Sequence, residues 1–68
     1  MNRHEKAIGI IGLRLNEINR DIEDAEWVIE NQPEHAADRD YHGTLEYYLE
    51  VKESLECSIK LLEGDQNP

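Results

Sequence analysis

The fold is decided by residues 8–29, which read IGIIGLRLNEINRDIEDAEWVI. Apolar side chains recur there at alternating spacings of three and four residues, at Ile8, Ile11, Leu15, Ile18, Ile22, Ala25 and Ile29. This spacing gives one apolar stripe on a helix with a period of about 3.5 residues, typical of a helix that packs lengthwise against another. We expect helix 1 from about residue 3 to residue 30, with Asn2 and Glu5 as a capping pair at its start.

A second stripe with the same spacing follows later in the chain, and Lys52 is its only polar member. Its members are Tyr41, Leu45, Tyr48, Lys52, Leu55, Ile59 and Leu62. Gly64 is a suitable C-terminal stop for this helix. The two stripes predict two antiparallel helices that share one coiled-coil-like seam.

Two interpretations of the connection between the helices remain open. Asn31 is suited to a left-handed stop, and Pro33 disfavours helical geometry at the residue before it but suits a first helical turn. The first interpretation is a tight turn at about 31–33 and helix 2 at about 34–63, with Gly43 on its outer surface. In the second, helix 2 starts near Thr44 and residues 32–43 form a loop over the end of helix 1.

The fold class is therefore all-α: an antiparallel two-helix hairpin in a single domain, residues 1–64, followed by a disordered tail, residues 65–68. Several apolar residues fall outside the seam, and a hairpin alone would leave them in water. We expect two hairpins to pair into a homodimeric four-helix bundle that buries them. The residues expected at this dimer interface are Ile10, Val28, Tyr47, Val51 and Leu61.

Composition limits the classes of function. The 68 residues carry 7 basic and 16 acidic side chains, a formal net charge of −9. Residues 1–20 have a net charge of +2 and residues 21–68 one of −11, so most of the surface repels nucleic acid and attracts basic protein surfaces. No apolar run is long enough to cross a membrane. No signal-peptide cleavage pattern follows the first apolar stretch, so we expect no cleaved signal peptide. The single cysteine, Cys57, fits a location in a reducing cytoplasm.

Catalytic and cofactor patterns are missing from the sequence. No nucleophile, base and oxyanion site assemble in it, and it has no phosphate-binding loop, so we expect a protein that is not an enzyme and binds no cofactor. Carboxylates around Cys57 disfavour a reactive thiol. One metal hypothesis stays open, because His35, Asp38 and His42 would share a face if the helix ran through them, although no fourth ligand is evident.

Two surfaces are candidates for recognition of a partner. The first is the outer face of helix 1, where basic and apolar residues alternate, at Lys6, Leu13, Arg14, Arg20 and Trp27. Such a face suits a phosphate backbone or a partner protein. The second is an acidic face on helix 2, for which we select Glu46, Glu50 and Glu53; carboxylates on a rigid helix can imitate nucleic-acid phosphates.

The chain is a short acidic helical hairpin with a heptad seam, a tight turn and a polar tail. This layout resembles that of the Rop family of plasmid copy-number regulators. This resemblance implies a homodimeric four-helix bundle that binds paired RNA loops through helix 1, with Lys6, Arg14 and Arg20 as phosphate contacts. Trp27 and Leu13 on that face depart from it and suit a protein interface better.

Three functions follow, and we favour a small acidic regulator or inhibitor that binds another protein. The alternatives are an RNA-binding homodimer of Rop-like architecture and a structural assembly module. All three expect self-association, and none expects contact with a membrane.

Overall fold

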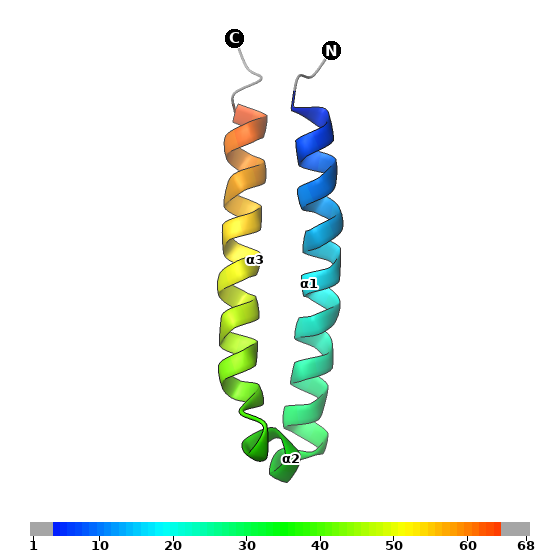
Figure 1. The fold of residues 1–68 in the computed structure, drawn as a ribbon, viewed down its shortest axis with the longest axis vertical. Helices are drawn as coiled ribbons and strands as arrows, with labels where there is room; N and C mark the ends of the chain where they lie inside the picture. Colours follow the sequence, from blue (N-terminus) through cyan, green and yellow to red (C-terminus); the bar gives the residue numbers. More distant parts are fainter. Residues whose placement is uncertain (1–3, 65–68) are drawn as a thin grey trace.

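A computed structural model describes residues 4–64 of the chain. Two long helices, α1 (Glu5–Asn31) and α3 (Tyr41–Gly64), run antiparallel, and a short helix, α2 (Pro33–Asp38), joins them at one end. Figure 1 shows the two long helices side by side along the whole rod, which measures 52 × 15 × 13 Å. We call the end at α2 the closed end and the other the open end. The all-α hairpin predicted from the two stripes is confirmed.

The start of α1 differs slightly from the expected one. The helix begins at Glu5, preceded by His4, whose side chain makes no capping hydrogen bond. The predicted capping residue Asn2 lies outside the described residues, as do the expected first helical residue, Arg3, and the tail at 65–68.

The expected left-handed stop at Asn31 is wrong. Asn31 is the last residue of α1, and its side-chain amide donates a hydrogen bond to the Trp27 carbonyl at 2.9 Å. Gln32 ends the helix instead, with φ −135° and ψ 63°. This geometry agrees with the restriction that Pro33 places on the residue before it, and Pro33 itself opens α2.

Neither interpretation of the connection is correct, because residues 33–63 form neither one helix nor a loop up to residue 43. Helical structure is interrupted at Arg39 and Asp40, and Asp40 has a positive φ of 51°. Its carboxylate accepts a hydrogen bond from the Gly43 N–H at 3.3 Å, which satisfies one of the free donors in the first turn of α3. Aspartate tolerates the left-handed region better than most residues, so one side chain both ends the connection and starts α3.

The first interpretation placed Gly43 on the outer surface of an uninterrupted helix, and this is wrong. Gly43 lies in the first turn of α3 and is partly buried. A Cβ added there would lie 3.0 Å from the Asp40 Cγ, closer than real Cβ contacts normally come. Glycine leaves the space that the Asp40 carboxylate occupies.

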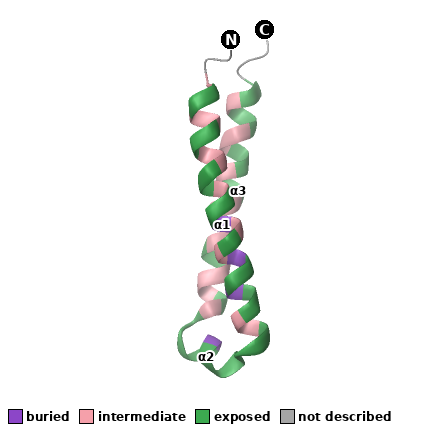
Figure 2. Ribbon diagram, turned by 90° about the vertical axis from the view of Figure 1, so that its right-hand side faces the viewer, coloured by how far each residue is buried: buried purple, intermediate pink, exposed green. Residues whose placement is uncertain are grey.

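The seam follows the two predicted stripes. In α1, all seven stripe residues are buried or partly buried, and in α3 all seven are partly buried. The buried side chains are few and run from the middle of α1 to the closed end: Ile18, Ile22, Ala25 and Ala36. Figure 2 shows this uneven burial, with buried residues on α1 and α2 and none on α3.

The helix α2 closes the end of the rod. Its Ala36 is completely inaccessible to solvent, whereas the neighbouring Ala37 is exposed. His35 on α2 contacts Tyr41 at the start of α3, with ring centroids 5.5 Å apart. Among the described residues, no helix has the length and apolar character needed to cross a membrane.

Candidate interaction surfaces

One long side of the hairpin carries exposed apolar residues. Asp21 of α1 and Thr44 of α3 line the same groove, so they lie on the same side of the seam. Residues three, four or seven positions away along each helix share that side. We call this surface the apolar face; its apolar and small residues are Ala7, Ile10 and Val28 on α1 and Thr44, Tyr47, Val51, Ser54, Ser58 and Leu61 on α3. The middle of α1 adds four charged residues to the same side: Arg14, Glu17, Asp21 and Asp24.

The apolar face contains all five residues that the sequence predicted at a dimer interface. Tyr47 is 61% exposed and Leu61 73% exposed, Ile10 is similarly open, and Val28 and Val51 are partly buried. Small side chains lie between them, namely Ala7, Thr44, Ser54 and Ser58, and allow another helix to approach closely. The hairpin itself does not cover this face.

The outer face of α1 is exposed as the sequence predicted. Leu13 is 67% exposed, Trp27 is 56% exposed, and Lys6 and Arg20 face solvent beside them. Arg14, which the sequence analysis grouped with this face, lies seven residues before Asp21 and so on the side of the apolar face. Its guanidinium forms an ion pair with Glu17 at 2.8 Å. That pair leaves Arg14 less available to a phosphate than a solvated cation would be.

The opposite long side is acidic. Glu46, Glu50 and Glu53, the residues selected from the sequence, are all exposed on α3. Spacings of three, four or seven residues place further glutamates on the same side, and we call this set the acidic face: Glu5, Glu23, Glu26 and Glu30 on α1, and Glu46, Glu50, Glu53, Glu56 and Glu63 on α3. Leu49 lies among them and is 48% exposed, an apolar residue that the sequence analysis did not select.

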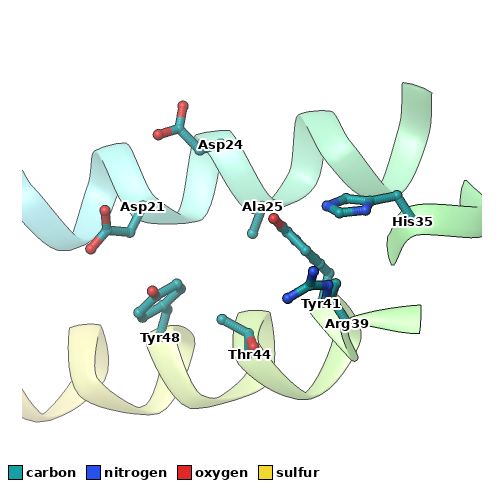
Figure 3. A pocket seen from close by; sticks show the side chains of 8 residues that line it. All are labelled: Asp21, Asp24, Ala25, His35, Arg39, Tyr41, Thr44 and Tyr48. Atoms are coloured by element: carbon teal, nitrogen blue, oxygen red, sulfur yellow. The ribbon is translucent and has the colours of Figure 1, made fainter. Parts of the chain in front are cut away.

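A groove of about 640 Å³ opens on the apolar-face side, near the closed end. Figure 3 shows Asp21, Asp24 and Ala25 on α1 and Thr44 and Tyr48 on α3. Tyr41 extends from α3 toward Ala25, and His35 and Arg39 complete the lining at the closed end. The groove is open to solvent and combines tyrosine rings with carboxylates.

The metal hypothesis is not supported in the described part of the chain. His35 and Asp38 belong to α2, whereas His42 belongs to α3, so the break at Asp40 removes the common helical face that the hypothesis required. Within residues 4–64, no group of three or more histidine, cysteine or acidic side chains is placed to hold a metal ion. Cys57 is a free, exposed thiol on α3.

Sequence reasoning missed the groove, because the groove depends on the register between two helices and on the break before α3. One signal was present in the sequence: Arg14 and Asp21 are seven residues apart, as are Glu17 and Asp24, so each pair lies on one side of α1. That spacing marks a charged row beside the apolar residues.

No protein-family model, curated protein or solved structure matches this chain. The function proposed below therefore rests on the interaction surfaces.

Proposed function

We propose that this protein is a small, non-enzymatic binding protein that works as a homodimer and regulates or inhibits a larger protein. Two hairpins pair through the apolar face into a four-helix bundle, and the acidic face stays outside to bind a basic surface. The observation that supports pairing is the mismatch between a small buried core and large exposed side chains. Only four residues between 4 and 64 are buried, while Ile10, Tyr47 and Leu61 are largely exposed.

The energetic argument follows from burial. A large aliphatic or aromatic side chain contributes about 1.5–3 kcal/mol when it moves from water into a core. A hairpin of this size has little stability of its own, so a few such side chains per subunit decide whether it is marginal or stable. Pairing buries them on both copies at once, because a two-fold interface uses the same residues twice.

Charge supports a basic partner for the acidic face. The face carries nine glutamates on two rigid helices, with Lys60 as a basic residue among them by the same spacing, which is a fixed array rather than a flexible acidic tail. Such an array attracts a basic protein surface and speeds the encounter with it. Basic surfaces that bind nucleic acid are one class of such partners, so a nucleic-acid mimic falls within the proposal.

RNA binding through α1 has weaker support. Arg14 pairs with Glu17, and Lys6 and Arg20 are separated by two heptads with exposed Leu13 between them. This arrangement offers few free cations for a phosphate backbone, which usually takes many. A structural assembly module would use the apolar face without the acidic one, and the experiments below separate it from the favoured function.

Self-association is tested by light scattering on the purified chain. The expected mass is about twice the 7.9 kDa of one chain. Leu61→Gln on the apolar face should shift the protein toward monomer, whereas Leu13→Gln, a residue of similar exposure on the outer face of α1, should not. A monomeric wild-type chain with a cooperative melt would contradict the homodimer.

Partner binding is tested by affinity capture from the native host, with three variants as comparators. Charge reversal at Glu46, Glu50 and Glu53 should abolish capture and leave the helical circular-dichroism spectrum unchanged. Capture should also weaken with salt, because exposed charges are screened over about 8 Å at physiological ionic strength. If reversal of Arg14 and Arg20 abolishes binding instead and RNA co-purifies by absorbance, the RNA-binding alternative holds. If neither set matters, the assembly module does.

A further inference from the structure

The charge of the hairpin is divided unevenly between its two ends. Residues 21–49, which form the closed half, contain nine acidic residues and one basic residue, a net charge of −8. Residues 5–20 and 50–64, which form the open half, contain six acidic and five basic residues, a net charge of −1. A second copy that pairs with its closed half against this closed half would bring the two strongly acidic regions together.

The same division appears along the apolar face itself. Arg14 lies in the open half, and Asp21 and Asp24 lie in the closed half, on the same side of α1. Arg14 already pairs with Glu17 within its own helix at 2.8 Å, but both side chains of that pair are more than half exposed, so the guanidinium keeps donors free for a second carboxylate. Asp21 lines the groove, Asp24 stands at its rim, and neither carboxylate has a hydrogen bond or ion pair within residues 4–64. Arg39 also lines the groove, at its closed end beside Tyr41, and in the described part of the chain it pairs with neither of them. The groove thus presents two unpaired carboxylates near the rings of Tyr41 and Tyr48, and a second guanidinium suits both carboxylates and ring faces.

We propose that the second copy docks head to tail on the apolar face, with its open half against the closed half and its Arg14 directed to the Asp21 and Asp24 end of the groove. This inference rests on the homodimer proposed above. A two-fold axis through the middle of the rod near Ile18 brings Arg14 of each copy to the level of Asp21 of the other, because both lie within about one helical turn of that centre. Each contact therefore forms twice.

The apolar residues fit the same orientation. Ile10 and Leu61 are exposed in the open half, and Val28 and Tyr47 lie on the apolar face in the closed half, Tyr47 exposed and Val28 partly buried. Head-to-tail docking places the two aliphatic side chains of one copy over Val28 and Tyr47 of the second. The opposite orientation would place Arg14 against Arg14 and Asp21 against Asp21, and like charges in contact select against it.

Distance measurement between spin labels tests the orientation. Glu63 is exposed near the open end of α3, so Glu63→Cys in a Cys57→Ser background gives one label per chain. Because Glu63 lies about 11 residues from the middle of α3, head-to-tail pairing separates the two labels by at least ~30 Å along the rod. Glu63 lies on the acidic face, so the labels point away from the interface in both orientations. Head-to-head pairing would leave only the bundle width and two label linkers between them, about 30 Å, whereas the added offset along the rod raises the head-to-tail distance to about 40 Å or more.

Charge exchange tests the contact. Arg14→Asp alone and Asp21→Arg alone should each weaken dimerisation by about tenfold or less, since exposed pairs are modest but occur twice. The double variant should recover wild-type affinity, and Arg20→Asp on the outer face should change little. Light scattering separates the failures: a monomer overturns the homodimer together with its orientation, whereas a dimer with close labels, or with no rescue by the double variant, overturns only the head-to-tail contact.

Discussion

The carboxylate of Asp40 occupies the space that a side chain on Gly43 would need. Asp40 Oδ1 accepts the Gly43 N–H at 3.3 Å, and a Cβ on residue 43 would lie 3.0 Å from the Asp40 Cγ. The two residues are in direct contact, because the carboxylate that accepts the Gly43 N–H lies where a side chain on residue 43 would be. This contact separates α2 from α3 and so shapes the closed end.

The first prediction concerns Asp40. Asp40→Ala should lower the free energy of unfolding by about 1–2 kcal/mol, because alanine removes the cap and is disfavoured at a positive φ. Asp40→Asn keeps both properties and should change stability by less than about 0.5 kcal/mol. Urea unfolding followed by circular dichroism measures both. Equal losses in the two variants would show that the side chain does not cap α3.

The second prediction concerns the coupling between the two positions. In the wild type, Gly43→Ala should gain about 1 kcal/mol of helix propensity but displace the Asp40 carboxylate, so its net effect should be close to zero. In an Asp40→Gly background the same change should stabilise by about 1 kcal/mol, because no cap remains to be lost. A double-mutant cycle measures the difference. Additive effects would mean that the two residues do not interact.

The third prediction contrasts two seam residues. Ile18 is 1% exposed and is the largest fully buried side chain, whereas Leu55 is only partly buried. Ile18→Ala should cost about 2–5 kcal/mol through the lost contacts and the cavity left behind, and Leu55→Ala should cost clearly less. Thermal unfolding of both variants gives the comparison. A larger loss at Leu55 would place the core in α3, contrary to the observed burial.

The fourth prediction concerns Ala36, the buried residue of α2 at the closed end. Ala36 is fully buried, so Ala36→Leu has no space for its added atoms and should destabilise by about 1–3 kcal/mol. Ala37→Leu is the matched control, since the same change at an exposed position of the same helix should be nearly neutral. Chemical unfolding of the two variants distinguishes them. If both are neutral, α2 does not pack against the long helices in solution.

The seam could be predicted from the sequence because the 3.5-residue period depends only on neighbours along one helix. The seven stripe residues between Ile8 and Ile29 and the seven between Tyr41 and Leu62 are all at least partly buried, as the period requires. The position of the break before α3 was not predicted: one interpretation ran a single helix through it and the other started the helix near Thr44 after a loop, because Asp38, Arg39 and Asp40 are ordinary helix-surface residues by pattern. Their effect depends on one hydrogen bond between Asp40 and Gly43, and propensity does not resolve such a bond.

The interaction surfaces were also only partly predictable from the sequence. Exposure of Trp27, Tyr47 and Leu61 follows from their positions off the seam, and the structure agrees. The groove required knowing which side of α1 faces which side of α3, a relationship between residues such as Asp21 and Thr44 that are distant in sequence. Periodicity within one helix carries no information about that relationship until the register is known.

The last prediction concerns Lys52, the polar member of the α3 stripe. Lys52 is partly buried in the seam, and no ion pair is recorded for it between residues 4 and 64. Its alkyl stem packs against apolar neighbours while the ammonium must reach water, which limits how much apolar surface this position buries. Lys52→Leu should therefore raise the free energy of unfolding by about 1 kcal/mol, as more apolar area leaves water. Lys60→Leu, the same change at an exposed site of α3, should leave stability within about 0.5 kcal/mol.

Urea unfolding at a fixed protein concentration measures both variants, because stability of a dimer depends on concentration. A loss of stability in Lys52→Leu would show that the ammonium makes a favourable interaction in solution, and that the seam is specified by that charge rather than weakened by it.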